Sequence, residues 1–490
     1  MSAERYKELR EKHKRFIYEG YDVHTGKGVL HVSYRFEIEG LRKFVSKWEF
    51  PYSHVYGKKP GEDEAVLWGR GDNADSDPIL RRLILSLGMV EAISYYKIAC
   101  PEEFVIKAGK FTDKQLKFWK HLFHDGLGEF LYLNGIDDVT EDELLTFADG
   151  TAGDENAAGG HADLHSANGM AGDCNLPLHD PRSYQGFLVP VGGGKDSVVS
   201  LELLKGEDIV TYVVNGNETT RNVIDVCDHK SGAYTAKRIL DKQIIELNSL
   251  GYLNGHIPFS AVLAFSAVIS AYLSGRKYIA LSNENSANET TVKGSYVNHQ
   301  YSKSFEFERD FREYISDLTD SDIHYFSFLR PLAEIQIAAL FSGYTAYHKA
   351  FRSCNRGSKE GIWCCDCPKC LFVNIILLPF LNDAEILNIF GEKLLDKESL
   401  DKDFRELTGI DENKPFECVG TRSEVRAALS YYVSHGGKSL LTDRYIDYVN
   451  QTDSSALKCI LHSWNDENGV PDEIIDRVRE GLDSFLKSFS

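Results

Sequence analysis

The sequence predicts an α/β fold whose central domain is a parallel sheet covered by helices. Three short apolar runs, at 187–191, 209–214 and 278–281, have the length and composition of buried strands. Helical patterns separate these runs, and an alternation of strand and helix is typical of parallel strands joined by helical crossovers. Because ligands of such sheets bind at the carboxyl ends of the strands, the residues that follow each run are the first candidates for a functional site.

The regions on either side of this alternation have other patterns. Apolar and polar residues alternate through 29–38, which indicates a half-buried strand, and 80–96 carries apolar residues on one helical face. From about residue 150, Gly, Ala, Asn and Asp replace the large apolar residues that a core needs. The predicted organisation is an N-terminal α+β domain (1–148), a flexible linker or insertion (149–183), the central α/β domain with a cysteine cluster (184–382) and a helical C-terminal region (383–490).

Length, apolar runs and charge limit the classes of protein to which the chain can belong. At 490 residues it is too long for one typical core, so two or three domains are expected. No apolar run approaches the length of a membrane span, and the charged N-terminus lacks the apolar core of a signal peptide, which predicts a cytoplasmic protein without a membrane partner. The formal net charge of −19 disfavours a nucleic-acid partner, since a nucleic-acid surface needs clustered Lys and Arg.

A glycine-rich turn follows the first apolar run and leads into a helical pattern. Its residues are Gly192, Gly193, Gly194, Lys195, Asp196 and Ser197. Glycines let a phosphate approach the backbone, and the first-turn N–H groups of a helix have no partner within it, so the turn predicts a nucleotide site. Lys195 adds positive charge, and Asp196 either holds Mg²⁺ against the phosphate or caps the helix. Ser197 can donate to a phosphate oxygen or cap the helix. The alternative for the whole motif is a plain glycine turn between strand and helix.

Two further strand ends are predicted to lie beside this turn. Asn215 follows the second apolar run, and Glu284 lies in the polar segment that follows the third. Because the carboxyl ends of parallel strands share one edge of a sheet, both residues are predicted to belong to the nucleotide site.

Ten cysteines are present, and five of them lie within seventeen residues. Cys354, Cys364, Cys367 and Cys370 have spacings that match a tetrahedral structural zinc site, and Cys365 is a spare. An iron–sulfur cluster with the same ligands and a set of free buried thiols are the alternatives. A closed four-cysteine site leaves no open position for substrate, so the metal is expected to have no chemical role.

Polar residues gather in several segments between the glycine turn and the cysteines. Asn298, Lys303 and Arg330 are predicted to contact substrate, and the last two can hold carboxylate or phosphate groups. Glu306 and Glu334 are predicted instead to form structural ion pairs.

These motifs resemble known families. The turn resembles the S-G-G-x-D-S loop of the ATP pyrophosphatase (PP-loop) superfamily, except that Gly192 stands where that motif usually has Ser. The cysteine cluster is similar to the zinc site of 7-cyano-7-deazaguanine synthase. Across about 190–420 the chain resembles more closely the bacterial UDP-N-acetylmuramoyl-L-alanyl-L-glutamate epimerases of the MurL type. That resemblance rests on 192–197, 254–258, 282–284, 298–304, 329–331, 363–370 and 416–421, and on a separate N-terminal domain.

The resemblance implies a parallel-sheet, PP-loop ATP pyrophosphatase-like central domain that binds ATP and Mg²⁺. Members of that family invert the terminal L-Glu of UDP-MurNAc-L-Ala-L-Glu, a UDP-muramoyl dipeptide used in peptidoglycan synthesis. Adenylation of the carboxylate makes the α-proton more acidic, and AMP and pyrophosphate are released. Cys418, His256 and His299 are then the candidates for proton transfer, since Cys and His can work near neutral pH.

Two other functions fit the same residues. One is a different PP-loop enzyme that adenylates a small-molecule carboxyl group or an RNA base and then adds ammonia or sulfur, although the net charge disfavours an RNA substrate. The other is a regulatory protein that binds a nucleotide without any chemistry. The release of AMP from ATP separates the enzymes from the regulator.

Overall fold

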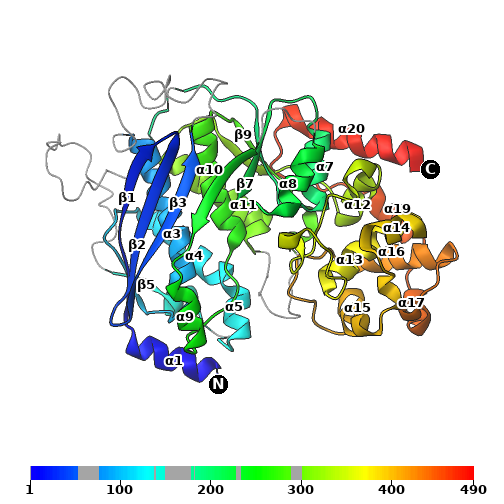
Figure 1. Ribbon diagram of the computed structural model, residues 1–490, viewed down its shortest axis with the longest axis horizontal. Coiled ribbons are helices and arrows are strands. Elements are labelled where there is room, and N and C mark those ends of the chain that lie inside the picture. The colour runs from blue at the N-terminus through cyan, green and yellow to red at the C-terminus, as the bar shows by residue number, and fades with distance from the viewer. Residues whose placement is uncertain are drawn as a thin grey trace. The chain divides into compact units, whose positions relative to one another are not determined.

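The computed structural model describes residues 2–52, 77–136, 139–148, 178–180, 182–227, 233–288 and 301–489. It confirms an α/β protein with extensive sheet and abundant helix (Figure 1). The chain forms two compact units: the first comprises 1–185, 234–277 and 306–324, and the second comprises 186–233, 278–305 and 325–490. Most of the predicted linker, 149–183, lies outside the described residues. No described helix is both long enough and apolar enough to span a bilayer.

The sheet of the first unit has the strand order β8-β3-β2-β1-β4-β5. Strands β1, β2, β3 and β8 pair antiparallel, while β4 pairs parallel with β1 and with β5. Buried and more accessible residues alternate along β2, as its sequence predicts for a strand with one face on a core. The bounds are β1 Arg15–Gly26, β2 Val29–Ile38, β3 Arg42–Pro51, β4 Glu103–Ile106, β5 Thr146–Phe147 and β8 Ala233–Ile239.

The helices of the first unit include α3, which is buried along nearly its whole length and contacts β1, β2 and α10. The side chain of Asp77 caps α3 by accepting from the N–H of Leu80, and α10 ends at Gly275, where φ is +67°. The bounds are α1 Ser2–Lys12, α3 Pro78–Tyr96, α4 Asp113–Gly126, α5 Gly128–Leu133, α6 Glu141–Leu144, α9 Gln243–Ser249, α10 Phe259–Ser274 and α11 Phe305–Leu318.

The sheet of the second unit has the strand order β10-β9-β6-β7. Strand β6 pairs parallel with both β7 and β9, as the run of buried strands predicts. All four residues of β6 are buried, and so are the first five of β7. The bounds are β6 Phe187–Pro190, β7 Ile209–Val214, β9 Tyr278–Leu281 and β10 His324–Ser327.

One apolar core joins this sheet to the helices of the second unit, including those of the C-terminal region. The bounds of the α-helices are α7 Lys195–Leu203, α8 Glu218–Val226, α12 Glu334–Ser342, α13 Pro368–Leu377, α14 Asp383–Phe390, α15 Asp401–Thr408, α16 Arg422–Ser434, α17 Leu440–Arg444, α18 Ile446–Val449, α19 Ala456–Leu461 and α20 Asp472–Phe489. Short 3₁₀ turns are η2 Asn285–Asn288, η3 Tyr301–Lys303, η4 Thr345–Tyr347, η5 Ser358–Glu360, η6 Leu394–Asp396 and η7 Glu398–Leu400.

Candidate active site

The glycine turn connects the end of β6 to the start of α7 in the second unit. Gly193 has φ +87°, and Gly194 is the N-cap residue of α7 in an extended conformation with no side-chain cap. The hydroxyl of Ser197 donates to the carbonyl of Gly194 at 2.9 Å. A helix N-terminus without a side-chain cap, preceded by glycines, is the geometry that binds an anion through backbone N–H groups.

The first two glycines of the turn differ in their surroundings. A Cβ atom at Gly193 would lie 2.6 Å from the side chain of Thr219 and 3.1 Å from its backbone carbonyl carbon. A Cβ atom at Gly192 would meet nothing within 4 Å. Packing therefore requires glycine at 193 but not at 192, where the related motif usually has Ser.

We expect Gly193→Ala to lower the free energy of unfolding by about 1–3 kcal/mol, because it combines a left-handed backbone with a steric overlap. Gly192→Ser is the matched control, and its effect is expected to stay within about 0.5 kcal/mol. Denaturant unfolding of both variants measures the difference. Equal stability of the two variants would contradict this account of the turn.

A buried ion cluster lies at the start of α7. The ammonium of Lys195 is 1% exposed and pairs with the carboxylates of Asp196 and Glu334. Burial opposes the charge on Lys195, but the two carboxylates outweigh it and raise its pKa. The Asp196 side chain keeps 30% exposure, whereas that of Glu334 keeps 4%. Lys195 therefore holds Asp196 in a position where its carboxylate is partly accessible to solvent. The Lys195 ammonium itself is buried between two carboxylates, so a phosphate could reach it only by displacing one of them.

The two carboxylates of this cluster have opposite pKa shifts. Burial alone would raise the pKa of Asp196, but Lys195 first and then Lys369 hold it below its ordinary value. Burial raises the pKa of Glu334; Lys195 opposes that shift, and Asp196 and Glu284 add to it. Asp196 is therefore the carboxylate that stays ionised and accessible, which is the state that a divalent cation requires.

Arg330 and Glu284 form hydrogen bonds that hold the segments following β9. Arg330 is fully buried, and its guanidinium donates to the main-chain carbonyls of Glu284, at 2.6 Å, and of Lys303. The carboxylate of Glu284 accepts from the N–H of Ser286. Burial raises the pKa of Glu284, and the Glu424 carboxylate raises it further. Arg330 thus holds two segments of the site together, and its predicted contact with substrate stays a prediction.

Lys303 brings Cys418 to the same cluster. Its ammonium lies 3.0 Å from the Cys418 sulfur. Burial lowers the pKa of Lys303, but Cys418, and then Glu284 and Asp196, outweigh burial and raise it. By reciprocity the Lys303 ammonium favours the thiolate form of Cys418, which is the form that can accept a proton.

The other predicted site residues have different placements. Asn215 follows β7 with φ +51°, a left-handed conformation that Asn tolerates better than most residues. His256 lies in the first unit, with Nδ1 3.3 Å from a carboxylate oxygen of Glu129. Asn298 and His299 lie outside the described residues. The structure therefore brings together the glycine turn, Glu284, Lys303 and Cys418 within the second unit.

Two charged residues of the cluster were not predicted from the sequence. Lys369 is the second residue of α13, between Cys367 and Cys370, is 8% exposed and contributes to the low pKa of Asp196. Glu424 is 3% exposed and accepts from the N–H groups of Ile335 and Thr421, at 3.0 and 2.8 Å. The sequence does show a capping box from Thr421 to Glu424. That the Glu424 carboxylate is buried beside other carboxylates can be learned only from the fold.

The four predicted cysteines form a cluster that fits a metal ion. The sulfurs of Cys354, Cys364, Cys367 and Cys370 all lie within 4.8 Å of one another, and those of Cys364 and Cys370 are 3.7 Å apart. Four thiolates bound tetrahedrally at about 2.3 Å to one zinc ion would lie about 3.8 Å apart. Cys365 lies outside this group and donates to the carbonyl of Phe390 at 3.4 Å.

The cysteine cluster supports the glycine turn through the residues that precede its first ligand. The N–H of Arg352 donates to the carbonyl of Gly193 at 2.9 Å. The hydroxyl of Ser353 accepts from the N–H of Lys195 at 3.4 Å. Cys354 follows directly, so any ion that fixes this cysteine also fixes the turn.

Comparisons with known proteins identify the family to which the chain is similar. Residues 7–328 match the MurL N-terminal domain family, and residues 350–452 match the MurL C-terminal domain family. Two relatives carry the name UDP-N-acetyl-alpha-D-muramoyl-L-alanyl-L-glutamate epimerase. The protein from Xanthomonas oryzae pv. oryzae is 32% identical over 80% of this chain and 84% of its own. The protein from Salinispora tropica is 34% identical over 76% of this chain and 78% of its own. No solved structure gives a significant match.

Proposed function

This chain belongs to the MurL family of epimerases, and from that premise we propose that it inverts the terminal L-Glu of UDP-MurNAc-L-Ala-L-Glu to D-Glu. The enzyme is then an isomerase that acts on a small soluble precursor of peptidoglycan. We further propose that the reaction consumes ATP and proceeds through an adenylated carboxylate. The glycine turn with an ionised, accessible Asp196 at the start of α7 is the observation that carries this second part.

The chemistry explains why an inversion would need ATP. The α-proton beside a carboxylate is very weakly acidic, because its removal places a second negative charge next to the first. When a carboxylate oxygen attacks the α-phosphorus of ATP, pyrophosphate leaves and an acyl-AMP forms. A base then removes the α-proton, a proton returns on the opposite face, and water attacks the acyl carbon to release AMP.

The residues of the turn suit the first of these steps. No side chain of the N-cap residue Gly194 caps the backbone N–H groups at the start of α7, which suits an anion there, and Asp196 offers a carboxylate for Mg²⁺. Mg²⁺ bound there would neutralise the charge of the leaving pyrophosphate. Lys195 orients Asp196 through its buried ion pair rather than by direct contact with phosphate. Asn215 and Glu284 remain predicted members of the same nucleotide site.

Cys418 and Lys303 suit the proton transfer. A thiolate beside an ammonium is a base that works near neutral pH, and the Cys418 sulfur lies 3.0 Å from the Lys303 ammonium. Lys303 can also hold the negative charge that develops when the α-proton leaves. His256 and His299 stay predicted candidates for the second proton-transfer group, and Asn298 for contact with substrate.

The function can be tested with purified protein, ATP, Mg²⁺ and UDP-MurNAc-L-Ala-L-Glu. We expect substrate-dependent release of AMP and pyrophosphate, and D-Glu after acid hydrolysis of the product. Formation of D-Glu without release of AMP would refute the adenylation step, but the proposed epimerase activity would stand. Binding of ATP with neither product would refute both and favour the regulatory alternative.

We propose that the four-cysteine cluster holds one structural Zn²⁺. Sulfurs that all lie within 4.8 Å of one another fit a single ion, whereas an iron–sulfur core placed between them would need more space. Hydrogen bonds from the neighbouring thiols, Cys370 first, lower the pKa of Cys367, and the same hydrogen bond to Cys367 raises the pKa of Cys370. A ligand must lose its proton to bind zinc.

Metal analysis of the purified protein is expected to find one zinc per chain. Cys364→Ser should lose the zinc, because it removes one of four ligands, and should weaken ATP binding through the turn that the cluster supports. Cys365→Ser is the matched control and should keep both. Iron with inorganic sulfide in place of zinc, or full zinc in Cys364→Ser, would contradict the assignment.

A further inference from the structure

Four basic side chains are buried among the described residues of the second unit, and protein groups hold three of them. The ammonium of Lys195 pairs with two carboxylates, and the guanidinium of Arg330 donates to two carbonyls. The ammonium of Lys414 donates to the carbonyl of Gly420 at 3.0 Å. Lys369 is the fourth, and it forms no hydrogen bond or ion pair with a described residue. Its charge is therefore not satisfied by the protein.

The side chain of Lys369 is buried along its stem but not at its tip. The residue is 8% exposed and lies in the first turn of α13, and its nitrogen is 5.6 Å from the centre of the Phe372 ring. The nitrogen itself is not sealed from solvent. Because burial of the stem removes rotamer freedom, the ammonium is held at one place on an accessible surface.

That surface belongs to the ion cluster at the start of α7. After burial and Lys195, the charge of Lys369 is the next influence on the pKa of Asp196, which it lowers. It also opposes the rise that burial causes in the pKa of Glu334. Helix α13 contacts α12, of which Glu334 is the first residue. Lys369 pairs with neither carboxylate, so its ammonium stays open to a negatively charged group beside Asp196.

Packing around Gly420 shows the same proximity without any charge. A Cβ atom at Gly420 would lie 3.0 Å from the Phe372 ring and 3.1 Å from the Cβ of Glu334. One glycine therefore touches both the ring beside the Lys369 ammonium and the residue that pairs with Lys195.

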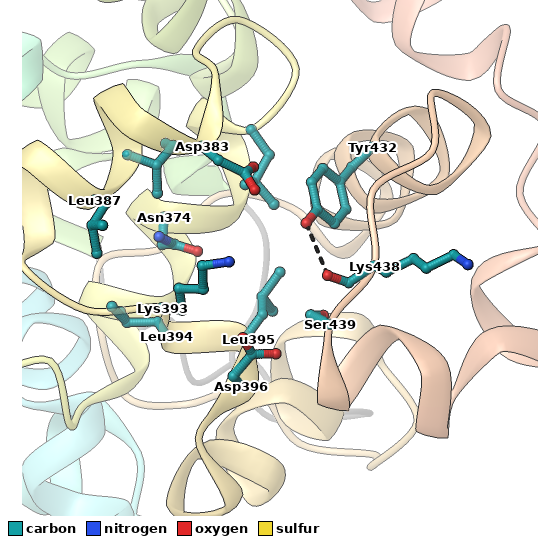
Figure 2. Close-up of a pocket in the computed structure, with 12 residues that line it drawn as sticks. Asn374, Asp383, Leu387, Lys393, Leu394, Leu395, Asp396, Tyr432, Lys438 and Ser439 are labelled. Atoms are coloured by element: carbon teal, nitrogen blue, oxygen red, sulfur yellow. Dashed lines mark hydrogen bonds between the residues drawn. The ribbon is translucent and has the colours of Figure 1, made fainter.

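The later part of α13 offers a contrast. Asn374 lines a different pocket, in which the hydroxyl of Tyr432 donates to the carbonyl of Lys438 at 3.3 Å (Figure 2). The lysines of that pocket, Lys393 and Lys438, are exposed. An exposed lysine is hydrated and indicates no ligand, whereas the buried stem of Lys369 holds its charge beside a carboxylate that is proposed to bind Mg²⁺.

We propose that Lys369 binds the β- and γ-phosphates of ATP at the glycine turn, the part of the nucleotide that leaves as pyrophosphate. This inference rests on the proposed adenylation reaction. Lysine is a common phosphate ligand, and Lys195, the basic residue of the turn itself, is held by two carboxylates. The pyrophosphate gains negative charge as its bond to the α-phosphorus breaks, so a fixed ammonium there would stabilise the transition state.

The position of Lys369 would also give the cysteine cluster a part in ATP binding. Lys369 lies between Cys367 and Cys370, whose sulfurs belong to the four-cysteine group. An ion bound to both would fix the backbone on each side of the lysine. A metal without a chemical role would then still affect the affinity for ATP.

Isothermal titration of the full chain with pyrophosphate, ATP and AMP, each with Mg²⁺, tests the assignment. Lys369→Met removes the charge and should weaken the binding of pyrophosphate and ATP about 10–100-fold, the usual loss for a charge-assisted hydrogen bond, but that of AMP less than about threefold. Lys369→Arg keeps the charge and should bind pyrophosphate at least about fivefold more tightly than Lys369→Met. Lys458→Gln removes an exposed charge from α19 and is the matched control, with wild-type binding of all three expected.

The possible outcomes separate this assignment from the proposed function. Unchanged pyrophosphate affinity in Lys369→Met would overturn the assignment and leave the adenylation proposal standing. An equal loss of AMP affinity would overturn it as well, because the lysine would then act on the shape of the turn. Wild-type protein that binds neither ATP nor pyrophosphate would overturn both. Zinc content and thermal unfolding check each variant, and Lys369→Gln replaces Lys369→Met if the latter loses its metal or its fold.

Discussion

Asp196→Asn is expected to reduce the ATP-dependent release of AMP by about 10³-fold or more while the protein stays folded. A divalent cation at a phosphoryl centre contributes several kcal/mol to the transition state, and each 1.36 kcal/mol is a factor of ten in rate. Asn keeps the shape of the side chain but removes the charge that would bind Mg²⁺. The rate of AMP release at saturating ATP, Mg²⁺ and substrate measures the loss.

The surroundings of Asp196 predict that this variant folds. Its carboxylate is one of two that pair with Lys195, so Glu334 still compensates the buried ammonium when Asp196 is neutral. Loss of the Asp196 charge also removes a repulsion that raises the pKa of Glu334, which offsets part of the lost attraction to Lys195. Thermal unfolding is therefore expected to change little.

A matched control separates this effect from a general change of charge. Asp225→Asn removes an exposed carboxylate from α8, which belongs to the same unit, and should keep the wild-type rate. Full AMP release by Asp196→Asn would contradict the assigned Mg²⁺ role of the carboxylate. Loss of activity in both variants would point to a loss of overall negative charge rather than to a site.

The sequence predicts the strands of the second unit well, because a short run of apolar residues is enough to indicate a buried strand. The apolar runs at 187–191, 209–214 and 278–281 became β6, β7 and β9 with ends that differ by at most one residue. Alternation identified β2 at 29–38 in the same way. In contrast, β8 pairs with β3, about two hundred residues earlier, through Trp48 and Arg238. No local pattern encodes that pairing. The sequence therefore does not show that residues 234–277 belong to the first unit, although 186–233 before them belong to the second.

The candidate site shows the same limit. Motif spacing identified the glycine turn and the four cysteines, because the residues of each motif lie close together in the sequence. The ion pair between Lys195 and Glu334 joins residues 139 positions apart. Glu334 was predicted to form a structural ion pair, but only the fold shows that its partner is a residue of the turn. The contact of Lys303 with Cys418 spans 115 positions and is equally hidden from a pattern search.

Cys418→Ala is expected to reduce inversion at the glutamate α-carbon by about 10²–10⁴-fold, the usual contribution of a positioned acid or base. Release of AMP should continue, because adenylation and hydrolysis of the acyl-AMP need no proton from the α-carbon. In deuterated water the variant should return L-Glu without deuterium at that carbon. The wild-type enzyme should return D-Glu with deuterium there, and mass spectrometry of the acid-hydrolysed product measures both.

Cys459→Ala is the matched control, since Cys459 is an exposed cysteine on α19 and should leave every step unchanged. Lys303→Gln tests the partner of the thiol. The ammonium favours the thiolate, so without it the pH profile of inversion should move to higher pH while that of AMP release stays in place. This separation of two profiles is a result that a merely structural role of Lys303 would not produce.

The two variants together decide which group removes the α-proton. If Cys418→Ala still exchanges the α-proton at the wild-type rate, the base is another residue, and His256 and His299 become the next candidates. If the variant still exchanges the α-proton of L-Glu with solvent but forms no D-Glu, Cys418 serves only one face. Loss of both, with AMP release intact, is the outcome that places the Cys418–Lys303 pair at the reacting carbon and separates the ATP-consuming half of the reaction from the inversion itself.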